Sequence, residues 1–347
     1  MKLTRLSVRN VRSHEEVSVG LSDQTTVITG KNGTGKTTLL EAIHIALQGV
    51  SFKGVDSDVL RREAPWYRID LHLDDNTVRS VTFDPLRSSG KKRFIVDDKT
   101  SYRLSPRDKY PIVLFEPEDL RLLHGSPSRR RQFIDRFIAQ IDPLYSATIR
   151  RYERALKQRN TLLKRDDITS DDLFSWNIAL SEYGADIIER RIYAIELINK
   201  ELTNYYISIA HTNDTVTVHY SHTTIDHSSQ KLLRELESKT AYDRAVKHTS
   251  VGPHRHDIIF HFNTAPALTV ASRGEVRTIL LALKQIEVDI IRRITDKQPI
   301  ILLDDVFSEL DADRQMSIED LFSGSQIIIS SATSQAANTF LHINLDD

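Results

Sequence analysis

Residues 30–37 read GKNGTGKT, and their types and spacing fit a loop that holds nucleotide phosphates. Its glycines would let backbone N–H groups turn toward phosphate oxygens, Lys36 would reach the β and γ phosphates, and the Thr37 hydroxyl could ligate Mg²⁺. A glycine turn before an ordinary helix would give Lys36 and Thr37 no role. We therefore predict that nucleotide contacts Gly30, Lys31, Asn32, Gly33, Thr34, Gly35, Lys36, Thr37 and Thr38.

The stretch PIILLDD, residues 299–305, is a second candidate for phosphate chemistry. Its apolar run is typical of a buried parallel strand, and ligands bind α/β sheets at the carboxyl ends of such strands. We predict that Asp304 holds Mg²⁺ together with Thr37, directly or through water, and that Asp305 orients the attacking water. Lys36 and Asp305 are then the catalytic candidates. The alternative is a solvated turn after a strand.

The elements around these motifs follow from residue periodicity. Apolar alternation over residues 3–8 and the run TTVITG at 25–30 predict strands, and the second leads directly into the glycine loop. Short β-like runs from about 66 to 115 predict a small antiparallel lobe. After about residue 210 strand-like runs return, followed by a helix from Gly274 to about Ile294. The expected fold is α/β, with a phosphate-binding head built from both chain ends.

The middle of the chain has helical periodicity. Apolar residues from Tyr145 to Leu163 fall on one helical face, and those from Leu173 to Ile187 do so again after the polar break DDITSDD. Two such helices joined by a short loop predict an antiparallel hairpin, with lengths of roughly 35 Å and about 50 Å. We expect this hairpin to form an inserted arm.

Composition limits the class of protein. The 347 residues include 47 basic and 48 acidic side chains, so a surface for nucleic acid must be a local patch. The absence of cysteine excludes disulfides, thiolate catalysis and Cys-ligated zinc. The first residues lack the apolar run of a secretory signal, and no run of about 18 apolar residues occurs. We expect a soluble, cytoplasmic protein.

Two further motifs narrow the class. Lys36 and Asp304 lie 268 positions apart, too far for a small GTPase or nucleotide kinase. Ser272 and Gly274 at the start of an apolar helix resemble the signature motif of ABC-type and SMC-like ATPases, and SELD at 308–311 resembles their D-loop. Ser-x-Gly before a helix is also a plain amino-terminal cap. Because all four motifs stand in order, we favour the ATPase interpretation.

Longer stretches resemble the RecF family, whose members are related to SMC proteins. The resemblance covers most of the chain and includes VRNVRSHEEV, PEDLRLLHGSPSRRRQFIDR, VGPHRHDI, SRGEVRT and LLDDVFSELD. Family sequences generally read SQGQQRT and GPHRDD, so Arg273, Glu275, Val276 and His256 are departures. Equivalents of the Q-loop and H-loop are left unassigned.

The resemblance implies a function and a domain division. It implies an ABC/SMC-type head over 1–120 and 206–347 with a helical arm over 121–205. It also implies an Mg²⁺-dependent ATPase that dimerises on ATP and dissociates on hydrolysis, with Ser272 and Gly274 meeting the γ-phosphate across the dimer. Arg12 would face the phosphates or the interface, or be an ordinary surface arginine. The expected process is recombinational DNA repair and replication restart at gaps or single-strand to double-strand junctions, with RecR, together with RecO, as partners.

A local basic surplus suggests where DNA would bind. Between Arg129 and Arg165 there are eleven basic and three acidic residues. Such a surplus suits contacts with duplex phosphates, since the aromatic spacing of a single-strand stacking platform is absent. A solvated helix face with ion pairs is the alternative. The candidates are Arg129, Arg130, Arg131, Arg150, Arg151 and Arg154.

Other interpretations stay open from the sequence. In GPHRHD, zinc binding by His254 and His256 is disfavoured by their spacing, and Arg255 and Asp257 are interpreted as groups that support the signature region. A transport or translation ABC ATPase would need a coupling partner or tandem heads. A P-loop module could instead hold ATP as a switch without hydrolysing it.

Overall fold

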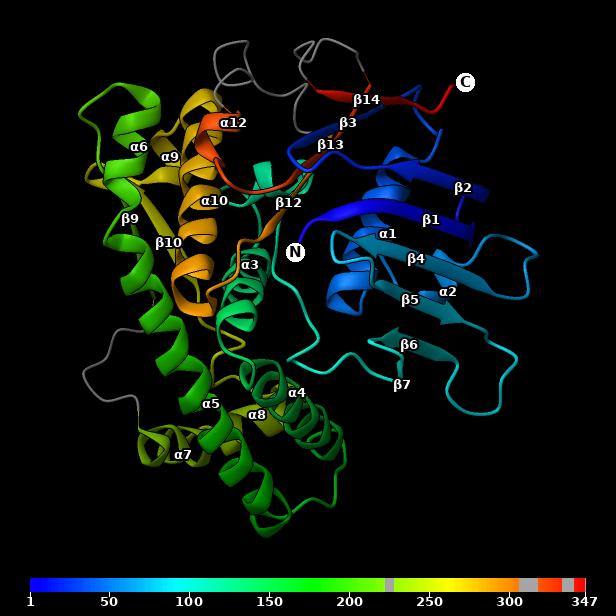
Figure 1. The fold of residues 1–347 in the computed structure, drawn as a ribbon. Helices are drawn as coiled ribbons and strands as arrows, with labels where there is room; N and C mark the ends of the chain where they lie inside the picture. Colours follow the sequence, from blue (N-terminus) through cyan, green and yellow to red (C-terminus); the bar gives the residue numbers. More distant parts are fainter. Residues whose placement is uncertain (222–227, 306–317, 333–339, 347) are drawn as a thin grey trace. The chain divides into compact units, whose positions relative to one another are not determined.

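Apolar runs from opposite ends of the chain form a five-stranded parallel sheet in the computed structural model (Figure 1). In four of its strands every residue is buried, because a parallel strand covered on both faces needs apolar side chains on both. The predicted strand before Asp305 is confirmed. The strand order is β14 (Leu341–Asn344), β3 (Thr25–Thr29), β13 (Ile327–Ser331), β12 (Ile300–Asp304) and β8 (Ile112–Phe115).

The structure describes residues 1–221, 228–305, 318–332 and 340–346. The chain divides into two compact units, here called unit 1 (Met1–Asp119 and Glu287–Asp347) and unit 2 (Leu120–Ile286). The parallel sheet belongs to unit 1, together with the short helices α2 (Asp56–Val59) and α12 (Ile318–Leu321). Among the described residues, no helix has both the length and the apolar character to cross a membrane.

A six-stranded antiparallel sheet is the second layer of unit 1. The predicted antiparallel lobe is confirmed as far as residue 101, but its last segment is wrong. Residues Ile112–Phe115 instead pair with β12 in the parallel sheet. All four side chains are buried, as in a strand that is packed against other elements on both faces of its sheet. The strand order is β2 (His14–Gly20), β1 (Leu3–Val11), β4 (Tyr67–Leu73), β5 (Val78–Phe83), β6 (Lys92–Val96) and β7 (Lys99–Ser101).

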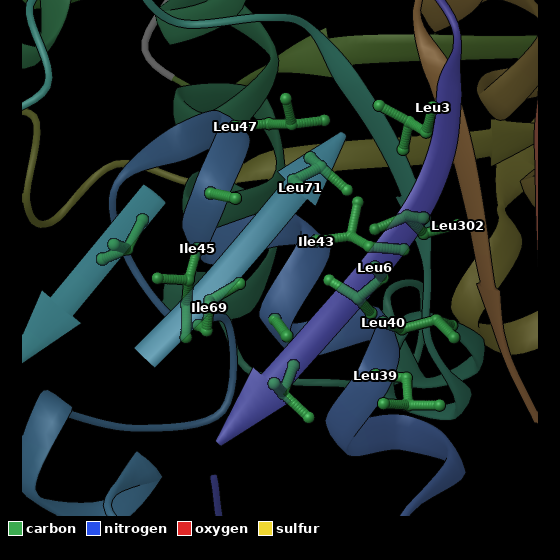
Figure 2. Packing of buried hydrophobic residues seen from close by; sticks show 14 of the residues in the cluster. Leu3, Leu6, Leu39, Leu40, Ile43, Ile45, Leu47, Ile69, Leu71 and Leu302 are labelled. Carbon is green, nitrogen blue, oxygen red and sulfur yellow. The ribbon is translucent and has the colours of Figure 1, made fainter. Parts of the chain in front are cut away.

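Helix α1 (Lys36–Gln48) packs between the two sheets. Figure 2 shows its side chains, among them Leu40 and Ile43, packed with Leu6 and Leu71 of the antiparallel sheet and Leu302 of β12. Nearly the whole helix is buried, and Gly49 in the left-handed conformation ends it. The amino terminus of α1 is therefore held firmly against the ends of β3 and β12.

Unit 2 is mainly helical. Its central pair is α4 (Tyr145–Leu162) and α5 (Ser170–Asn199), which contact each other along their length. Thr148 donates to Asp186, whereas Arg159, later in α4, donates to Asn177, which comes earlier in α5. The two helices are therefore antiparallel, and the predicted hairpin is confirmed. At about 1.5 Å per residue, the 30 residues of α5 span roughly 45 Å.

The remaining elements of unit 2 surround this hairpin. A sheet in the order β11-β10-β9 contacts α5 through β9, and α7 packs on α5 as well. Residues 206–286, expected in the head, thus share a compact unit with the hairpin, and the division falls inside α10. The elements are α3 (Pro127–Ile141), α6 (Leu202–Ala210), β9 (Val216–Tyr220), α7 (Ser229–Ser238), α8 (Thr240–Val246), β10 (Ile258–Phe262), β11 (Ala265–Pro266), α9 (Ala267–Val270) and α10 (Arg273–Thr295), while the 3-10 helix η1 (Pro117–Arg121) links the units.

A buried ion pair holds α4, α5 and α8 together. The side chains of Arg159 and Asp243 are both 0% exposed, with Nη1 of Arg159 2.7 Å from Oδ2 of Asp243. The same guanidinium donates to Asn177 at 2.7 Å and to Thr249 at 2.9 Å. Because a charge without a partner is costly inside a protein, these groups fix each other's positions.

Replacing Arg159 by methionine should lower the free energy of unfolding by about 3–5 kcal/mol, because Asp243 loses its counter-ion while still buried. Urea denaturation followed by circular dichroism measures this. Arg165→Met is the matched control, since Arg165 pairs with Asp167 in solvent and its loss should leave the curve unchanged. An Arg159→Met curve that overlays the wild type would refute the structural role.

Candidate active site

The glycine loop lies between β3 and α1, with Gly35 immediately before the helix. Gly35 has a φ of 94°, and a Cβ there would lie 2.2 Å from His14 Nε2 and 2.6 Å from Ser13 Oγ. A side chain at this position therefore has neither the conformation nor the room it needs. His14 Nε2 lies 3.1 Å from the Gly35 carbonyl, so the turn between β1 and β2 touches the end of the loop.

Lys36 fixes the curve of the loop. Its Nζ donates to the carbonyls of Gly30 and Lys31 at 2.6 and 2.9 Å, and the side chain is 7% exposed. An ammonium has three donors, so a phosphate oxygen can accept the third. The first N–H groups of α1 have no acceptor within the helix, so they can bind an anion at its amino terminus. Thr34 donates to Lys31 at 3.0 Å, while Thr38 is buried and Asn32 is exposed.

Three oxygen-bearing side chains converge at the end of β12. The Thr37 hydroxyl donates to Oδ1 of Asp304 at 2.5 Å, and Ser330 on β13 donates to the same oxygen at 2.8 Å. Asp304 is 2% exposed. A hydroxyl and a carboxylate are the hard oxygen donors that Mg²⁺ uses beside nucleotide phosphates, so the residues fit this ion. Thr37 and Asp304, predicted as one site, are in direct contact.

Asp305 directly follows the last residue of β12. Its φ of 51° lies in the left-handed region, which a non-glycine residue adopts only when its surroundings hold it there. Ser330 supplies that hold, because the Asp305 N–H donates to its Oγ at 2.9 Å and its carbonyl at 3.2 Å. Asp305 thus lies directly beside the Mg²⁺ candidate Asp304, and its catalytic role stays a prediction.

Ser330 is a residue that the sequence analysis missed, although it stands in the run SQIIISSAT. Its hydroxyl links Asp304 to the backbone of Asp305. The pairing of Asp304 with Ser330 in the sheet register explains this position, because parallel strands bring their carboxyl ends to one edge.

Arg12 lies beside the loop in an ion pair with Glu41 of α1. Its Nη2 is 2.7 Å from Oε1 of Glu41, its Nε also contacts that carboxylate, and Glu41 is 0% exposed. The hydrogen bond that Arg12 donates to the Glu41 carboxylate raises the pKa of the Arg12 guanidinium, which therefore stays charged. The side chain is 30% exposed, so the expected contact with phosphates or an interface stays a prediction.

A polar cavity of about 470 Å³ adjoins Arg12. Because Ser13 lines the cavity and also lies against Gly35, the cavity meets the glycine loop. Ser13 and His14 were not identified as candidates, although both directly follow Arg12 in the motif NVRSH. The other lining residues are Asn10, Arg61, Arg62, Glu63, Ala64 and Pro65.

In unit 2, Ser272 and Gly274 stand at the start of the 23-residue helix α10. Ser272 is exposed; its Oγ accepts from the Glu275 N–H at 3.3 Å, and its own N–H donates to the Glu275 carboxylate at 2.5 Å. This reciprocal pair is a capping box. The departure at Glu275 therefore has a structural role, and the cap interpretation of Ser272 is confirmed. Contact with nucleotide stays a prediction.

The six arginines proposed for DNA do not share one environment. Arg150, Arg151 and Arg154 are exposed on α4, and Arg129 is half-buried. Arg130 must be withdrawn as a DNA-binding candidate, because it is only 8% exposed. Its Nε and Nη2 donate to the two carboxylate oxygens of Asp257, at 2.9 and 2.7 Å.

Arg131 is also half-buried. It donates to the carbonyl of His256 at 2.7 Å, and burial, with the charge of Arg191 as a further cause, lowers its pKa. Arg130 and Arg131 therefore hold α3 to the segment 251–257. The exposed arginines of α4 remain the candidates for binding DNA.

The histidines of GPHRHD are structural. His254 Nδ1 lies 2.6 Å from the Tyr152 hydroxyl and its Nε2 lies 3.1 Å from the Thr249 carbonyl, while His256 Nδ1 lies 2.8 Å from the Tyr220 hydroxyl. Burial lowers the pKa of His254 to about 4, so the ring is neutral at pH 7. No group of three His, Asp or Glu side chains able to hold a metal occurs among the residues that the structure covers. The D-loop candidate at 308–311 lies outside the described residues.

Known proteins resemble this chain over nearly its whole length. Residues 5–240 match the family model described as an AAA domain. The chain is 33% identical over 336 residues to the DNA replication and repair protein RecF of Streptococcus agalactiae serotype V, covering 92% of this chain and 88% of the relative. It is 30% identical over 348 residues to the protein of that name from Lachnoclostridium phytofermentans, covering 95% and 92%.

Solved structures agree with these relatives. The recombination mediator protein RecF with ATP, in the RecFOR pathway, has a TM-score of 0.85 at 28% identity, covering 97% of this chain and 93% of that chain. An Smc head bound to the C-winged helix domain of ScpA has a TM-score of 0.53 at 14% identity, covering 96% and 90%, a likeness in fold alone.

Proposed function

The chain belongs to the RecF family of DNA replication and repair proteins, and we propose that it works as an ATP-dependent dimer on duplex DNA. Its fold is that of an ABC/SMC-type P-loop ATPase. It is an Mg²⁺-dependent ATPase and a recombination mediator of the RecF type. Membership of the RecF family leaves no support for the alternative that the chain is an ABC ATPase of transport or translation. Dimerisation, the DNA surface and the roles of single residues are the proposal.

The observation that carries the catalytic proposal is the contact of Thr37 with Asp304 beside the glycine loop. Lys36 and the amino-terminal N–H groups of α1 bind the phosphates and neutralise their charge. Thr37 and Asp304 would hold Mg²⁺, which supplies charge neutralisation on the β and γ phosphates. Asp305, held by Ser330, orients the attacking water and accepts its proton.

The cavity beside Arg12 would take the nucleoside end of ATP. It meets the loop at Ser13, so it lies next to the position proposed for the phosphates. Arg12 is fixed by Glu41 and stays charged, so it can contact phosphate or ribose oxygens without a change of rotamer.

Completion of the site in trans is the second part of the proposal. The exposed Ser272 and the half-buried Gly274 at the start of α10 offer a hydroxyl, backbone N–H groups and a helix terminus to the γ-phosphate of a second copy. ATP then stabilises the dimer by its higher affinity for the closed state, and hydrolysis removes that preference.

The DNA contact is assigned to α4. Arg150, Arg151 and Arg154 are exposed there, and Arg129 joins them as a weaker candidate because it is half-buried. Contacts with phosphates carry no sequence information, which suits binding at gaps or junctions of any sequence. A place in the cytoplasm and partnership with RecR and RecO complete the proposal, supported by family membership and by the RecFOR pathway of the solved relatives.

Lys36→Ala should abolish nucleotide binding, because the phosphates lose their main cation. Asp305→Asn should keep binding and stop turnover, since the amide cannot accept the proton of water. Equilibrium binding of a fluorescent ATP analogue and phosphate release measure the two steps. Robust turnover by the Asp305→Asn variant would remove Asp305 from the catalytic role.

A site completed in trans makes the rate of ATP hydrolysis per protomer rise with protein concentration. Duplex DNA should raise it further, because DNA favours the closed dimer. Phosphate release is measured over a concentration series with and without duplex, and Ser272→Ala should flatten the series. A rate that depends on neither concentration nor DNA would mean that one protomer suffices.

Reversing the charges of Arg150 and Arg151 to glutamate should weaken duplex binding by about tenfold and reduce the salt slope, by about 1 for each lost phosphate contact. Fluorescence anisotropy at several salt concentrations measures both. Arg244→Glu with Lys247→Glu is the matched control, since both residues are exposed on or beside α8 in the same unit. Unchanged affinity and slope in the α4 variant would remove α4 from the surface.

A further inference from the structure

Lys53 already binds the carboxylate that the proposed Mg²⁺ site requires. Its Nζ lies 3.0 Å from Oδ2 of Asp304. The other oxygen of Asp304 accepts hydrogen bonds from Thr37 and Ser330. Asp304 therefore has two neutral donors on one oxygen and a full positive charge on the other.

The loop that carries Lys53 is anchored, so this ion pair is not the chance contact of a free side chain. Ser51 Oγ accepts from the N–H groups of Lys53 and Gly54 at 2.9 and 3.0 Å and itself donates to Glu41. The ring centroids of Phe52 and His44 lie 5.4 Å apart, and His44 Nδ1 lies 2.7 Å from the Val50 carbonyl. Residues 50, 51 and 52 thus all contact α1, the helix that carries Thr37.

Burial gives the pair its energetic weight. The side chain of Asp304 is 3% exposed and that of Lys53 is 37% exposed, so the carboxylate is dry while the ammonium can reach solvent. A buried carboxylate needs a nearby cation or donors to stay ionised at low cost. Lys53 meets this need through a long flexible stem that can also withdraw.

Lysine and Mg²⁺ make competing demands on Asp304. Mg²⁺ binds carboxylate oxygen at about 2.1 Å, and a second full positive charge a few ångströms away would repel it strongly in a site of low dielectric. The side chain of Lys53 must therefore leave Asp304 before the ion can settle there.

We propose that Lys53 is a resident counter-ion of Asp304 that Mg²⁺ displaces, and that this competition sets the affinity of the site for Mg²⁺. The proposal rests on the assignment of Mg²⁺ to Thr37 and Asp304. The loop 50–54 that carries Lys53 stays in place when the side chain withdraws, because Ser51 binds the Glu41 carboxylate that also holds Arg12.

The test is a titration of Mg²⁺ at constant concentration of a fluorescent ATP analogue, with bound fluorescence as the readout. Lys53→Gln should lower the Mg²⁺ midpoint about fivefold, the factor that corresponds to about 1 kcal/mol for a half-exposed ion pair. Lys53→Arg keeps the charge and should stay near the wild type. Lys99→Gln is the control for loss of an exposed lysine elsewhere in unit 1. A midpoint for Lys53→Gln that is unchanged or higher overturns the proposal.

A second readout needs no variant of Lys53. In the wild-type protein, acetylation of Lys53, followed by mass spectrometry, should become faster as Mg²⁺ is added without nucleotide, because the displaced ammonium enters solvent. A rate that does not respond to Mg²⁺ counts against displacement.

Failure of this inference and failure of the Mg²⁺ site itself give different results. Thr37→Ala and Asp304→Asn should both raise the Mg²⁺ midpoint if the two residues hold the ion. If they leave it unchanged, the metal assignment fails. If they raise it while Lys53→Gln does not lower it, only the role of Lys53 fails. In the Asp304→Asn background, Lys53→Gln should have no effect, because the shared carboxylate is gone.

Discussion

The carboxylate of Asp304 is the group on which the arrangement of the head depends. It is almost completely buried, at the carboxyl end of a strand whose neighbours come from distant parts of the sequence. A carboxylate in such a place must be surrounded by donors and cations. Helix α1 supplies Thr37, β13 supplies Ser330 and the loop after α1 supplies Lys53. Each of these segments is therefore tied to one point, the proposed Mg²⁺ site.

Sheet register brings Ser330 to Asp304 and places the glycine loop beside them. Asp304 is paired with Ser330 in β12 and β13, and Ser331 is paired with Thr29 in β3. Since all these strands are parallel, the ends of all three lie at one edge, and the glycine loop leaves from that edge. The left-handed backbone of Asp305 lies at this same edge, where its N–H is bound to Ser330.

Local patterns predicted the parts of the structure that depend on local chemistry. The glycine loop, the buried strand before Asp305 and the helical hairpin each carry their signal in consecutive residues, and the structure contains all of them. What failed depends on tertiary packing. The charge run from Arg129 to Arg165 looked uniform in the sequence, yet Arg130 and Arg159 are buried and paired with Asp257 and Asp243, which lie about a hundred positions away. Helical spacing does put Arg159 on the same buried face as Tyr152, but nothing in the segment itself identifies the distant carboxylate that pairs with it. The same reasoning explains why Ser330 and Lys53 went unnoticed, since a serine and a lysine are common and only the fold places them on one carboxylate.

Two of the departures from the family pattern, Glu275 and His256, have partners of their own in this fold. Glu275 completes a capping box with Ser272, and His256 pairs with Tyr220 while its carbonyl accepts from Arg131. These contacts hold the start of α10 and the segment 251–257 in defined positions, and they leave the hydroxyl-bearing Ser272 at the exposed end of a 23-residue helix. A contact made across a dimer depends on the position of that end more than on the identity of the residues behind it. In the proposed dimer, substitutions that retain the cap therefore keep Ser272 in the position from which it would meet the γ-phosphate, even though the sequence of the motif has changed.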